Sequence, residues 1–356
     1  MLLYHDLRLA SRAKIAEDAF ALSFAVPDEL RSEFQFLPGQ HLPVRAVVGG
    51  KTLRRTYSIV SPQGGELMIG VRQQGQMSRY LTQDLPLNGT LQAMPPNGGF
   101  HPRLEPDCAK SYVAIAAGSG ITPILSIAAS VLSAEPKSRL LLIYANRSMA
   151  RCMFAEEVLA LKNRHMSRFS VHFLLTSEPS DQELLNGRVD SAKLTRFAQH
   201  GFDPTQVDEY FLCGPGTMIE DLSSALKSLG AAGKVHVERF GSAARIAESA
   251  PEAQREASPK PADVAEVSIL MDGRRRSFTM PFSGESLLDA AERAGLELPF
   301  SCRSGVCSTC RSKLTAGEVS MQYNQALEDW EVAAGYILCC QARPISRQIE
   351  LSYDEK

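Results

Sequence analysis

The spacing of the cysteines near the C-terminus constrains this chain more than any other feature. Cys302, Cys307 and Cys310 form a C-x4-C-x2-C run, and the adjacent Cys339 and Cys340 follow further along. This is the plant-type spacing of [2Fe–2S] cluster ligands. A zinc site favours paired C-x2-C knuckles, of which the run contains one, and a disulfide framework is typical of short secreted chains. The spacing therefore predicts a cluster that carries one electron at a time.

The residues between these cysteines suit a loop that wraps a cluster. Gly305 has no Cβ, so it permits the tight turn that such a loop requires. Ser304, Ser308 and Thr309 are small, and hydrogen bonds to cluster sulfurs tune the reduction potential. We therefore expect backbone and side-chain donors to point at the cysteine sulfurs.

The fourth ligand is ambiguous between Cys339 and Cys340. In plant-type ferredoxins the ligand follows a Leu-Thr pair, and here Leu338-Cys339-Cys340 places Cys339 where that Thr stands. We predict that Cys340 is the ligand and that Cys339 is a small buried thiol. The predicted cluster ligands are Cys302, Cys307, Cys310 and Cys340.

Composition narrows the class of protein. A chain of 356 residues suggests two or three domains, and a hydrophobic fraction of 44% is ordinary for a globular protein. The net charge of −2 offers no basic excess to neutralise phosphates, so a nucleic-acid partner is not expected. The chain lacks a run of apolar residues long enough to span a membrane, and its charged start is unlike a signal peptide. Eight cysteines without an export signal favour a reducing cytoplasm.

A linker divides the chain. Residues 241–262 are rich in Ala, Pro, Ser and Glu and poor in large apolar residues, a composition that cannot bury enough surface to fold alone. The segment 263–356 after it predicts a small mixed domain. It has a strand over 264–271, a turn at Asp272-Gly273, a returning strand over 276–281, a helix over 286–294, and further strands over 311–314 and 348–352. This order is similar to the β-grasp fold of plant-type ferredoxins.

The segment before the linker changes character along its length. Residues 1–107 contain short apolar runs separated by glycines, which predict an antiparallel β-barrel. Residues 108–240 alternate apolar runs at 112–117, 140–144, 171–175 and 210–213 with helical stretches. That alternation predicts a doubly wound α/β domain with a parallel sheet.

Two glycine turns in the α/β domain indicate a nucleotide site. The run Gly118-Ser-Gly120-Ile-Thr122-Pro123 joins a strand to a helix start, where glycines allow a pyrophosphate to approach the backbone. Pro123 stands where the Rossmann pattern has its third glycine, so this turn alone is a weak signal. The second turn, Cys213-Gly214-Pro215-Gly216-Thr-Met218, also follows a strand. Two such turns at strand ends predict one crevice for a ligand.

The barrel segment carries a motif suited to a flat, phosphate-bearing cofactor. In Arg55-Thr56-Tyr57-Ser58, the arginine can pair with a phosphate, the tyrosine can stack on a ring, and the serine can bond a ring nitrogen. Gly75-Gln-Met77-Ser78 begins a predicted helix and offers a second phosphate contact. The alternative for the first motif is a plain surface strand. The two glycine turns at the expected distance favour the cofactor.

Together these motifs give the chain a specific resemblance. R-x-Y-S, G-S-G-I-T-P and C-G-P-G-x-M match the ferredoxin–NADP reductase superfamily, and the appended ferredoxin-like domain makes the chain similar to three-domain reductases of bacterial oxygenases. With Asn146-Arg147-Ser148 and Val237-Glu238-Arg239-Phe240-Gly241, it also resembles the reductase subunits of phenylacetyl-CoA epoxidases. That narrower match is less specific, because related hydroxylase reductases share the domain order.

The resemblance implies cofactors and residue roles. It implies FAD bound through Arg55, Tyr57, Ser58 and Ser78, and nicotinamide bound through Gly118, Gly120, Thr122, Cys213, Gly214 and Met218. Ser58 and Cys213 would flank the site of hydride transfer, with Glu238 and Phe240 closing it. The alternatives are a small buried hydrophobe for Cys213, a solvated acid for Glu238 and a core residue for Phe240.

Carrier chemistry then orders the cofactors. A nicotinamide gives two electrons as a hydride, a [2Fe–2S] cluster accepts one, and a flavin can do both, so the flavin stands between them. The resemblance implies that the electrons pass to a di-iron oxygenase acting on an aromatic acyl-CoA. The alternatives are a reductase for a ring- or steroid-hydroxylating oxygenase and, in another class, an electron carrier or assembly subunit without turnover. The intact motifs argue against the last.

Two finer expectations concern charge. The segment after the second strand of the α/β domain holds Asn146, Arg147, Ser148 and Arg151 and no acid, which predicts a preference for NADPH, because a carboxylate there would repel a 2′-phosphate. The alternative is a solvated Arg147 and use of NADH as well. Separately, the acids at positions 328, 329 and 331 predict either a rim near the cluster that steers docking or a solvated helix face.

Overall fold

The structure, a computed structural model, describes residues 4–240 and 264–355. These ranges form two compact units, divided where the sequence predicts a linker. The predicted linker itself, residues 241–262, lies outside the described residues. Within the described ranges, no helix combines the length and the apolar character needed to cross a membrane.

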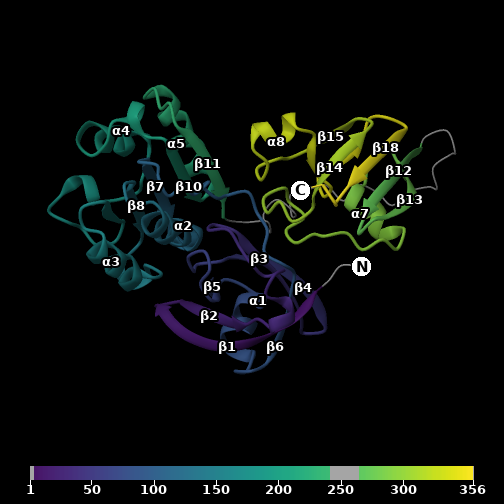
Figure 1. The fold of residues 1–356 in the computed structure, drawn as a ribbon, viewed down its shortest axis with the longest axis horizontal. Coiled ribbons are helices and arrows are strands. Elements are labelled where there is room, and N and C mark those ends of the chain that lie inside the picture. Colours follow the sequence, from purple (N-terminus) through teal and green to yellow (C-terminus); the bar gives the residue numbers. More distant parts are fainter. Residues whose placement is uncertain (1–3, 241–263, 356) are drawn as a thin grey trace. The chain divides into compact units, whose positions relative to one another are not determined.

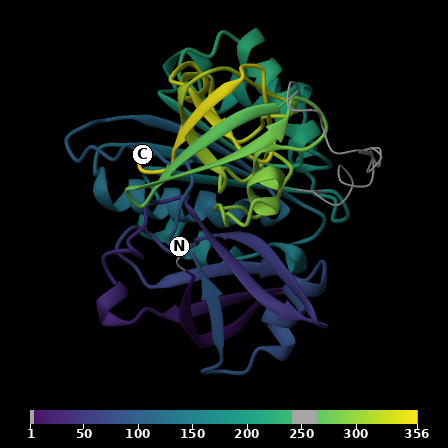
Figure 2. The same ribbon diagram turned by 90° about the vertical axis from the view of Figure 1, so that its right-hand side faces the viewer.

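An antiparallel barrel opens the first unit, as the sequence predicts (Figure 1). Its six strands lie in the order β4-β3-β6-β1-β2-β5, and a bridge between Ile59 and Ile69 joins the two ends of the sheet. Figure 2 shows its purple and blue strands curving around one interior. The strands are β1 (His5–Ala16), β2 (Ala19–Ala25), β3 (His41–Val48), β4 (Lys51–Ser58), β5 (Leu67–Arg72) and β6 (Thr90–Ala93), and the short helix α1 (Gln76–Arg79) follows β5.

The hairpin of β3 and β4 has a register set by its turn. Gly49 and Gly50 have φ values of 58° and 75°, the left-handed geometry of a two-residue hairpin turn. Counting back from this turn pairs Leu42 with Tyr57 and His41 with Ser58. The turn therefore decides which side chains accompany the R-x-Y-S motif on each face of the strand.

A parallel sheet in the order β11-β10-β7-β8-β9 forms the second half of the first unit. Helices α2 and α3 pack on one face and α4 and α5 on the other, because the inner strands are apolar on both sides. The four apolar runs are strands as predicted, whereas the partly exposed edge strand β11 was not predicted. The elements are β7 (Ser111–Ala117), α2 (Ile121–Ala134), β8 (Arg139–Asn146), α3 (Ala155–Arg164), β9 (Phe169–Leu175), α4 (Ser191–His200), β10 (Glu209–Gly214), α5 (Gly216–Ser228) and β11 (Lys234–Arg239).

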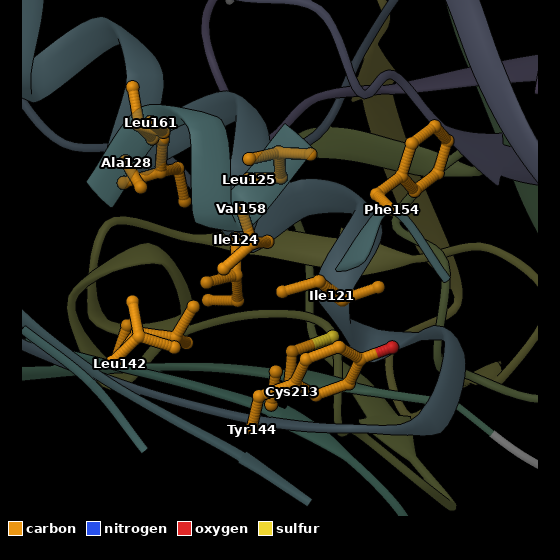
Figure 3. Close-up of a cluster of buried hydrophobic side chains, with 14 of the residues drawn as sticks. Ile121, Ile124, Leu125, Ala128, Leu142, Tyr144, Phe154, Val158, Leu161 and Cys213 are labelled. Atoms are coloured by element: carbon orange, nitrogen blue, oxygen red, sulfur yellow. The ribbon is translucent and has the colours of Figure 1, made fainter. Parts of the chain in front are cut away.

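Helix α2 joins the barrel to the parallel sheet. Eleven of its fourteen residues are buried, which is the pattern of a helix covered on all sides. Its apolar side chains share one core with strand residues of the sheet such as Leu142 and Tyr144 (Figure 3). The same core contains Ala19, Ala21 and Val60 of the barrel. Ser126 of α2 also donates a hydrogen bond of 2.5 Å to the Ser61 carbonyl. The barrel and the sheet are therefore packed as one body.

The second unit has the predicted β-grasp order. Its main sheet is β13-β12-β18-β14-β16, with β12 and β18 parallel, and β15 pairs with β17. Asp272 and Gly273 have positive φ in the predicted turn, and Ser286 and Asp289 form a capping box at the start of α7. The short strands β15, β16 and β17 are not predicted from the sequence, and α8 is predicted there only as the alternative of a solvated helix face. The bounds are β12 (Val264–Met271), β13 (Arg274–Pro281), α7 (Leu287–Arg293), β14 (Arg311–Ala316), β15 (Val319–Met321), α8 (Asp329–Ala333), β16 (Tyr336–Leu338), β17 (Ala342–Pro344) and β18 (Gln348–Ser352).

The shared core makes a prediction about stability. Ile124→Ala, at a fully buried position of α2, should lower the free energy of unfolding by about 2–5 kcal/mol, because the site loses methylenes and keeps a cavity. Urea unfolding followed by circular dichroism measures the change. Met166→Ala is the control, since Met166 is 76% exposed and its truncation should change stability by no more than about 0.5 kcal/mol. Equal unfolding midpoints for the two variants would contradict the role given to α2.

Candidate functional site

Two glycine turns meet at the carboxyl ends of neighbouring strands β7 and β10. A Cβ at Gly120 would lie 2.2 Å from the carbonyl oxygen of Cys213, so only glycine fits there. Gly118 has a φ of 58°, and a Cβ on it would meet nothing within 4 Å. Thr122 fixes the turn by donating a hydrogen bond of 2.9 Å to the Ser119 carbonyl. One glycine thus allows close strand packing, and the other leaves room for a ligand.

The second glycine turn is held by the chain that follows it. A Cβ at Gly214 would lie 2.6 Å from the methyl carbon of Met218, so this glycine also allows close packing. Pro215 precedes α5 as its N-cap and Gly216 is the first residue of that helix. The Phe240 amide donates a hydrogen bond of 2.9 Å to the Gly214 carbonyl. The end of β11 is therefore tied to the second glycine turn, beside the crevice that the sequence predicts.

Cys213 and Glu238 are neighbours in this crevice. They are register partners on the parallel strands β10 and β11, and the Cys213 thiol lies 3.8 Å from Glu238 Oε2. Cys213 is fully buried, and this burial, together with the Glu238 carboxylate, raises the pKa of its thiol well above the usual range. Cys213 is therefore a neutral thiol that meets an acid, as well as part of the hydrophobic core.

The barrel presents Ser58 and His41 to the same region. Ser58 is buried, and its hydroxyl has no hydrogen-bond partner among the described residues. Its register partner His41 places Nδ1 3.8 Å from Glu238 Oε1. A side chain of the barrel, His41, therefore meets a side chain of the parallel sheet, Glu238. The roles predicted for Ser58, Cys213 and Glu238 stay predictions. No sequence motif marks His41, although counting residues from the Gly49-Gly50 turn pairs it with Ser58.

The remaining residues of the R-x-Y-S motif alternate along β4. Arg55 is exposed and bonds the Arg54 carbonyl at 2.7 Å, so its guanidinium is accessible. Burial raises the pKa of Tyr57 and the nearby Arg55 charge opposes that shift, which places the two side chains together. Thr56 and Ser58 lie on the opposite face of the strand, because side chains of a strand alternate. The arrangement suits an arginine beside a ring-stacking tyrosine, with the serine on the other face of the strand.

The predicted phosphate contact near α1 has a different local role. The Ser78 hydroxyl accepts hydrogen bonds of 2.9 Å from the amides of Gln74 and Gly75 and donates one of 2.9 Å to the Gly75 carbonyl. Met77 is buried in the barrel core. The Ser78 hydroxyl thus closes the turn before α1. It would act on a ligand through the shape of that turn.

The four polar residues predicted to bind the nucleotide after β8 lie in different surroundings. Arg151 forms an ion pair of 2.6 Å with Asp18 of the barrel, which draws its charge away from the predicted 2′-phosphate contact. Asn146 donates to the Arg151 carbonyl at 3.0 Å and accepts from the Arg147 amide at 2.9 Å, and the Ser148 carbonyl accepts from the Arg151 amide. The roles predicted for Arg147 and Arg151 stay predictions, and Arg147 is the one of the two whose side chain is exposed.

The cysteines of the second unit lie in two pairs. A hydrogen bond with Cys307 lowers the pKa of Cys302 to about 5, against the effect of burial. In the same way, a hydrogen bond with Cys310 lowers the pKa of Cys340. No three or more His, Cys, Asp or Glu side chains in the described ranges gather in a way that could hold a single metal ion. Two thiol pairs instead suit a two-iron cluster with four cysteine ligands.

The loop around these pairs has the backbone that the sequence predicts. Gly305 has a φ of 73°, and a Cβ there would lie 2.6 Å from the Tyr323 carbonyl oxygen, so a side chain is excluded. Arg303 and Ser308 also have positive φ. The Ser304 amide donates to Cys302 Sγ at 3.4 Å. The chain thus turns tightly enough to aim amides at sulfur, which is what a cluster-binding loop needs.

The two adjacent cysteines point to different surroundings. Cys339 is fully buried, with Ser312 Oγ 3.2 Å and the Tyr353 hydroxyl 3.1 Å from its sulfur. Burial raises the pKa of Cys339 to about 11, so this thiol stays neutral in the core. Cys340 faces Cys310. Of the two adjacent cysteines, Cys340 is therefore the one whose sulfur bonds a cysteine of the C-x4-C-x2-C run, and its role as fourth ligand stays a prediction.

The predicted acidic rim near the cluster is wrong in one residue. Glu331 is 3% exposed and forms an ion pair with Arg311, next to Cys310, so it cannot steer a partner. Glu328 accepts a hydrogen bond of 2.6 Å from the Trp330 indole. Asp329 is exposed. The alternative of a solvated helix face also fails for Glu331, because α8 turns this residue inward. Sequence spacing does not reveal that orientation.

Comparison with known protein families supports this interpretation of the site. Residues 6–101 match the oxidoreductase FAD-binding domain, residues 114–224 match the oxidoreductase NAD-binding domain, and residues 269–344 match the 2Fe-2S iron-sulfur cluster binding domain. The three matches follow the order of barrel, parallel sheet and β-grasp unit.

Similar individual proteins share this order over their full length. A 1,2-phenylacetyl-CoA epoxidase component from Escherichia coli K12 is 38% identical over 100% of this chain and 99% of its own. The ferredoxin reductase component of 3-ketosteroid-9-alpha-monooxygenase from Rhodococcus rhodochrous is 32% identical over 94% and 93%. Among solved structures, phthalate dioxygenase reductase, described as a modular structure for electron transfer from pyridine nucleotides to [2Fe-2S], has a TM-score of 0.56 and 25% identity over 98% of each chain.

The contrast between Cys339 and Cys340 makes a prediction. Cys340→Ser should abolish the visible absorbance of the cluster, because it removes one of four ligands. Cys339→Ser should keep most of the absorbance, since a hydroxyl there can still bond Ser312 and Tyr353. Iron and acid-labile sulfide analysis of both variants provides the measurement. Loss of the cluster in Cys339→Ser with retention in Cys340→Ser would assign the fourth ligand to the wrong cysteine.

Proposed function

The chain belongs to the family of oxidoreductases that combine FAD-binding, NAD-binding and 2Fe-2S cluster binding domains, and we propose that it passes electrons from NADPH through FAD and the cluster to a di-iron oxygenase. The observation that carries the proposal is the approach of His41 Nδ1 in the barrel to within 3.8 Å of Glu238 Oε1 in the parallel sheet, with Cys213 on the other side of Glu238. This approach supports a site shared by the barrel and the sheet, where a flavin and a nicotinamide would face one another.

The domain boundaries belong to this proposal. We assign FAD to residues 1–107, the nicotinamide to 108–240 and the cluster to 263–356, with 241–262 as a linker. The family matches and the two compact units support these boundaries. A cytoplasmic location is part of the same proposal, because all eight cysteines are free and a reducing compartment keeps such thiols available for a cluster.

Each part of the flavin has residues that suit it. Bound FAD would supply the conversion of a two-electron hydride into single electrons. Arg55 would pair with the FAD phosphates, Tyr57 would stack on the flavin ring, and Ser58 would bond a nitrogen of that ring. The Ser58 hydroxyl is buried and has no protein partner, which fits a bond to the flavin. The turn that Ser78 closes at Gly75 shapes the backbone before α1.

The nicotinamide site follows from the crevice between the glycine turns. The open position at Gly118 and the start of α2 favour the pyrophosphate, because a helix N-terminus attracts negative charge. Cys213 and Glu238 lie where the reacting ring would face the flavin, and Phe240, tied to Gly214, borders that position. These side chains orient the ring and exclude water from the transferred hydride.

The partner proposal rests on the relatives. The Escherichia coli relative, 38% identical over the full length, is a subunit of 1,2-phenylacetyl-CoA epoxidase, and we propose an oxygenase of that kind, acting in phenylacetate catabolism, as the electron acceptor. A second candidate is a steroid-hydroxylating oxygenase, because reductase components of 3-ketosteroid-9-alpha-monooxygenases are 32% identical. Purified oxygenases of both kinds, each supplied with substrate and this reductase, distinguish them by the rate of product formation.

The electron route gives a direct test. The wild-type chain should oxidise NADPH with ferricyanide and should also reduce the oxygenase. Cys340→Ser, which lacks the cluster on this proposal, should keep ferricyanide reduction and lose oxygenase turnover, because the flavin retains its donor and loses its route onward. Stopped-flow absorbance and product analysis provide the two readouts. Undiminished turnover without the cluster would remove it from the electron path.

The choice of nucleotide gives a second test. Arg147→Ala should raise KM for NADPH by about ten- to a hundredfold and leave KM for NADH unchanged, because a lost charge-assisted hydrogen bond costs about 1.5–3 kcal/mol. Arg139→Ala is a matched control, since Arg139 is an exposed arginine at the opposite end of β8. Arg151 is left intact because its ion pair with Asp18 supports the barrel contact. A wild type that prefers NADH would refute the assignment.

A further inference from the structure

Three polar side chains form a row beside the crevice. His41 pairs with Ser58 across the β3–β4 hairpin and with Asn97 across an isolated antiparallel bridge. The bridge is made by hydrogen bonds of 2.9 Å and 3.1 Å between the backbones of His41 and Asn97. Side chains at directly paired positions lie next to each other on one face. Ser58, His41 and Asn97 therefore line up on one side of the barrel, and we name them the polar row.

Each member of the polar row has a buried atom that lacks a protein partner. Ser58 Oγ, His41 Nε2 and Asn97 Oδ1 are all shielded from solvent and make no hydrogen bond to the described residues. Leaving a buried polar group unpaired is unfavourable, so three side by side are the mark of a surface that receives a polar ligand. Ser58 belongs to the proposed flavin site, which makes the flavin the ligand that the row faces.

His41 also has a charged neighbour on its other nitrogen. Its Nδ1 lies 3.8 Å from Glu238 Oε1, and its side chain is 5% exposed. Across the crevice, Glu238 Oε2 meets the neutral Cys213 thiol, and Ser58 and Asn97 are uncharged. A protonated His41 would thus be buried with a carboxylate counterion. An imidazole with a carboxylate beside one nitrogen and no protein partner on the other has the geometry to hold a proton.

The proposed electron route creates a need for such a group. A hydride brings two electrons and one proton, so a neutral ring that accepts it gains one negative charge. The crevice is largely buried, where an uncompensated charge is costly. The electrons leave singly for the cluster, and the transferred proton must also leave. A residue that takes up and releases a proton in step with the electrons meets both needs.

We propose that His41 is the redox-linked proton site of this reductase, an inference that rests on the proposed function. NADPH loses a hydride and becomes NADP⁺, and His41 Nε2 binds one further proton from solvent as the flavin ring gains charge. After two electrons have passed to the cluster, the proton from the hydride and the proton on His41 both return to solvent. The sum is NADPH to NADP⁺, one proton and two electrons.

The pH dependence of the flavin midpoint potential tests this proposal. In the full-length wild type, one additional proton should accompany reduction over the neutral pH range. That proton changes the reduction equilibrium tenfold per pH unit, which for a two-electron couple is about 30 mV per pH unit. His41→Gln, which keeps the size and loses the titration, should lack this additional slope. Spectroelectrochemical titration measures it, with the cluster followed separately by electron paramagnetic resonance.

A matched control separates the proton site from a general effect of histidine. His5 lies on β1 of the same barrel, with Nε2 3.2 Å from Glu33 Oε2, and it belongs neither to the crevice nor to the polar row. His5→Gln should therefore keep the wild-type slope. An identical slope in wild type and His41→Gln would overturn the proposal.

A second variant covers the case in which His41→Gln does not retain FAD. Glu238→Gln removes the carboxylate beside His41, so the bend in the curve of potential against pH should move to lower pH. An unmoved bend would also overturn the proposal. A wild-type chain that binds no FAD, or whose FAD is not reduced by NADPH, would defeat the proposed function itself. Reducible FAD with an unaltered slope in His41→Gln defeats only the role of His41.

Discussion

The burial of helix α2 between the barrel and the parallel sheet is the contact on which the rest of the first unit depends. Its apolar residues belong to one hydrophobic core that also contains residues of the barrel and of the sheet. Ser126 of α2 donates a hydrogen bond to the Ser61 carbonyl of the barrel. Because protein cores are packed as densely as crystals, such a shared core leaves little freedom for one part to move against the other. The start of this same helix follows the first glycine turn, so packing also positions the nucleotide crevice.

The proposed nicotinamide site takes residues from both the barrel and the parallel sheet. Gly120 lets the chain pass against Cys213, and this close approach brings the ends of β7 and β10 together. The barrel then adds His41 and Ser58, whose register follows from the turn between β3 and β4. Neither part alone surrounds the site: one supplies the acid and the thiol, and the other supplies the imidazole and the hydroxyl.

Much of this could be predicted from sequence because the signals are local. The cysteine spacing, the glycine turns and the R-x-Y-S motif each lie within a few residues, where chain geometry allows few alternatives. The features that local patterns do not reveal depend on distant partners. Asp18 of the barrel pairs with Arg151, and Arg311 pairs with Glu331, which is buried inside the second unit and not on its surface as predicted.

The sequence by itself determined the kinds of domain, their order and the cofactors that each suits, because periodicity and motif spacing are properties of a short stretch of chain. Only the tertiary structure decided which polar groups face each other. His41 carries no motif, yet a two-residue turn places it beside Ser58, and the docking of barrel on sheet places it against Glu238. Those contacts join residues far apart in the chain, and long-range packing, which local patterns do not encode, sets their distance.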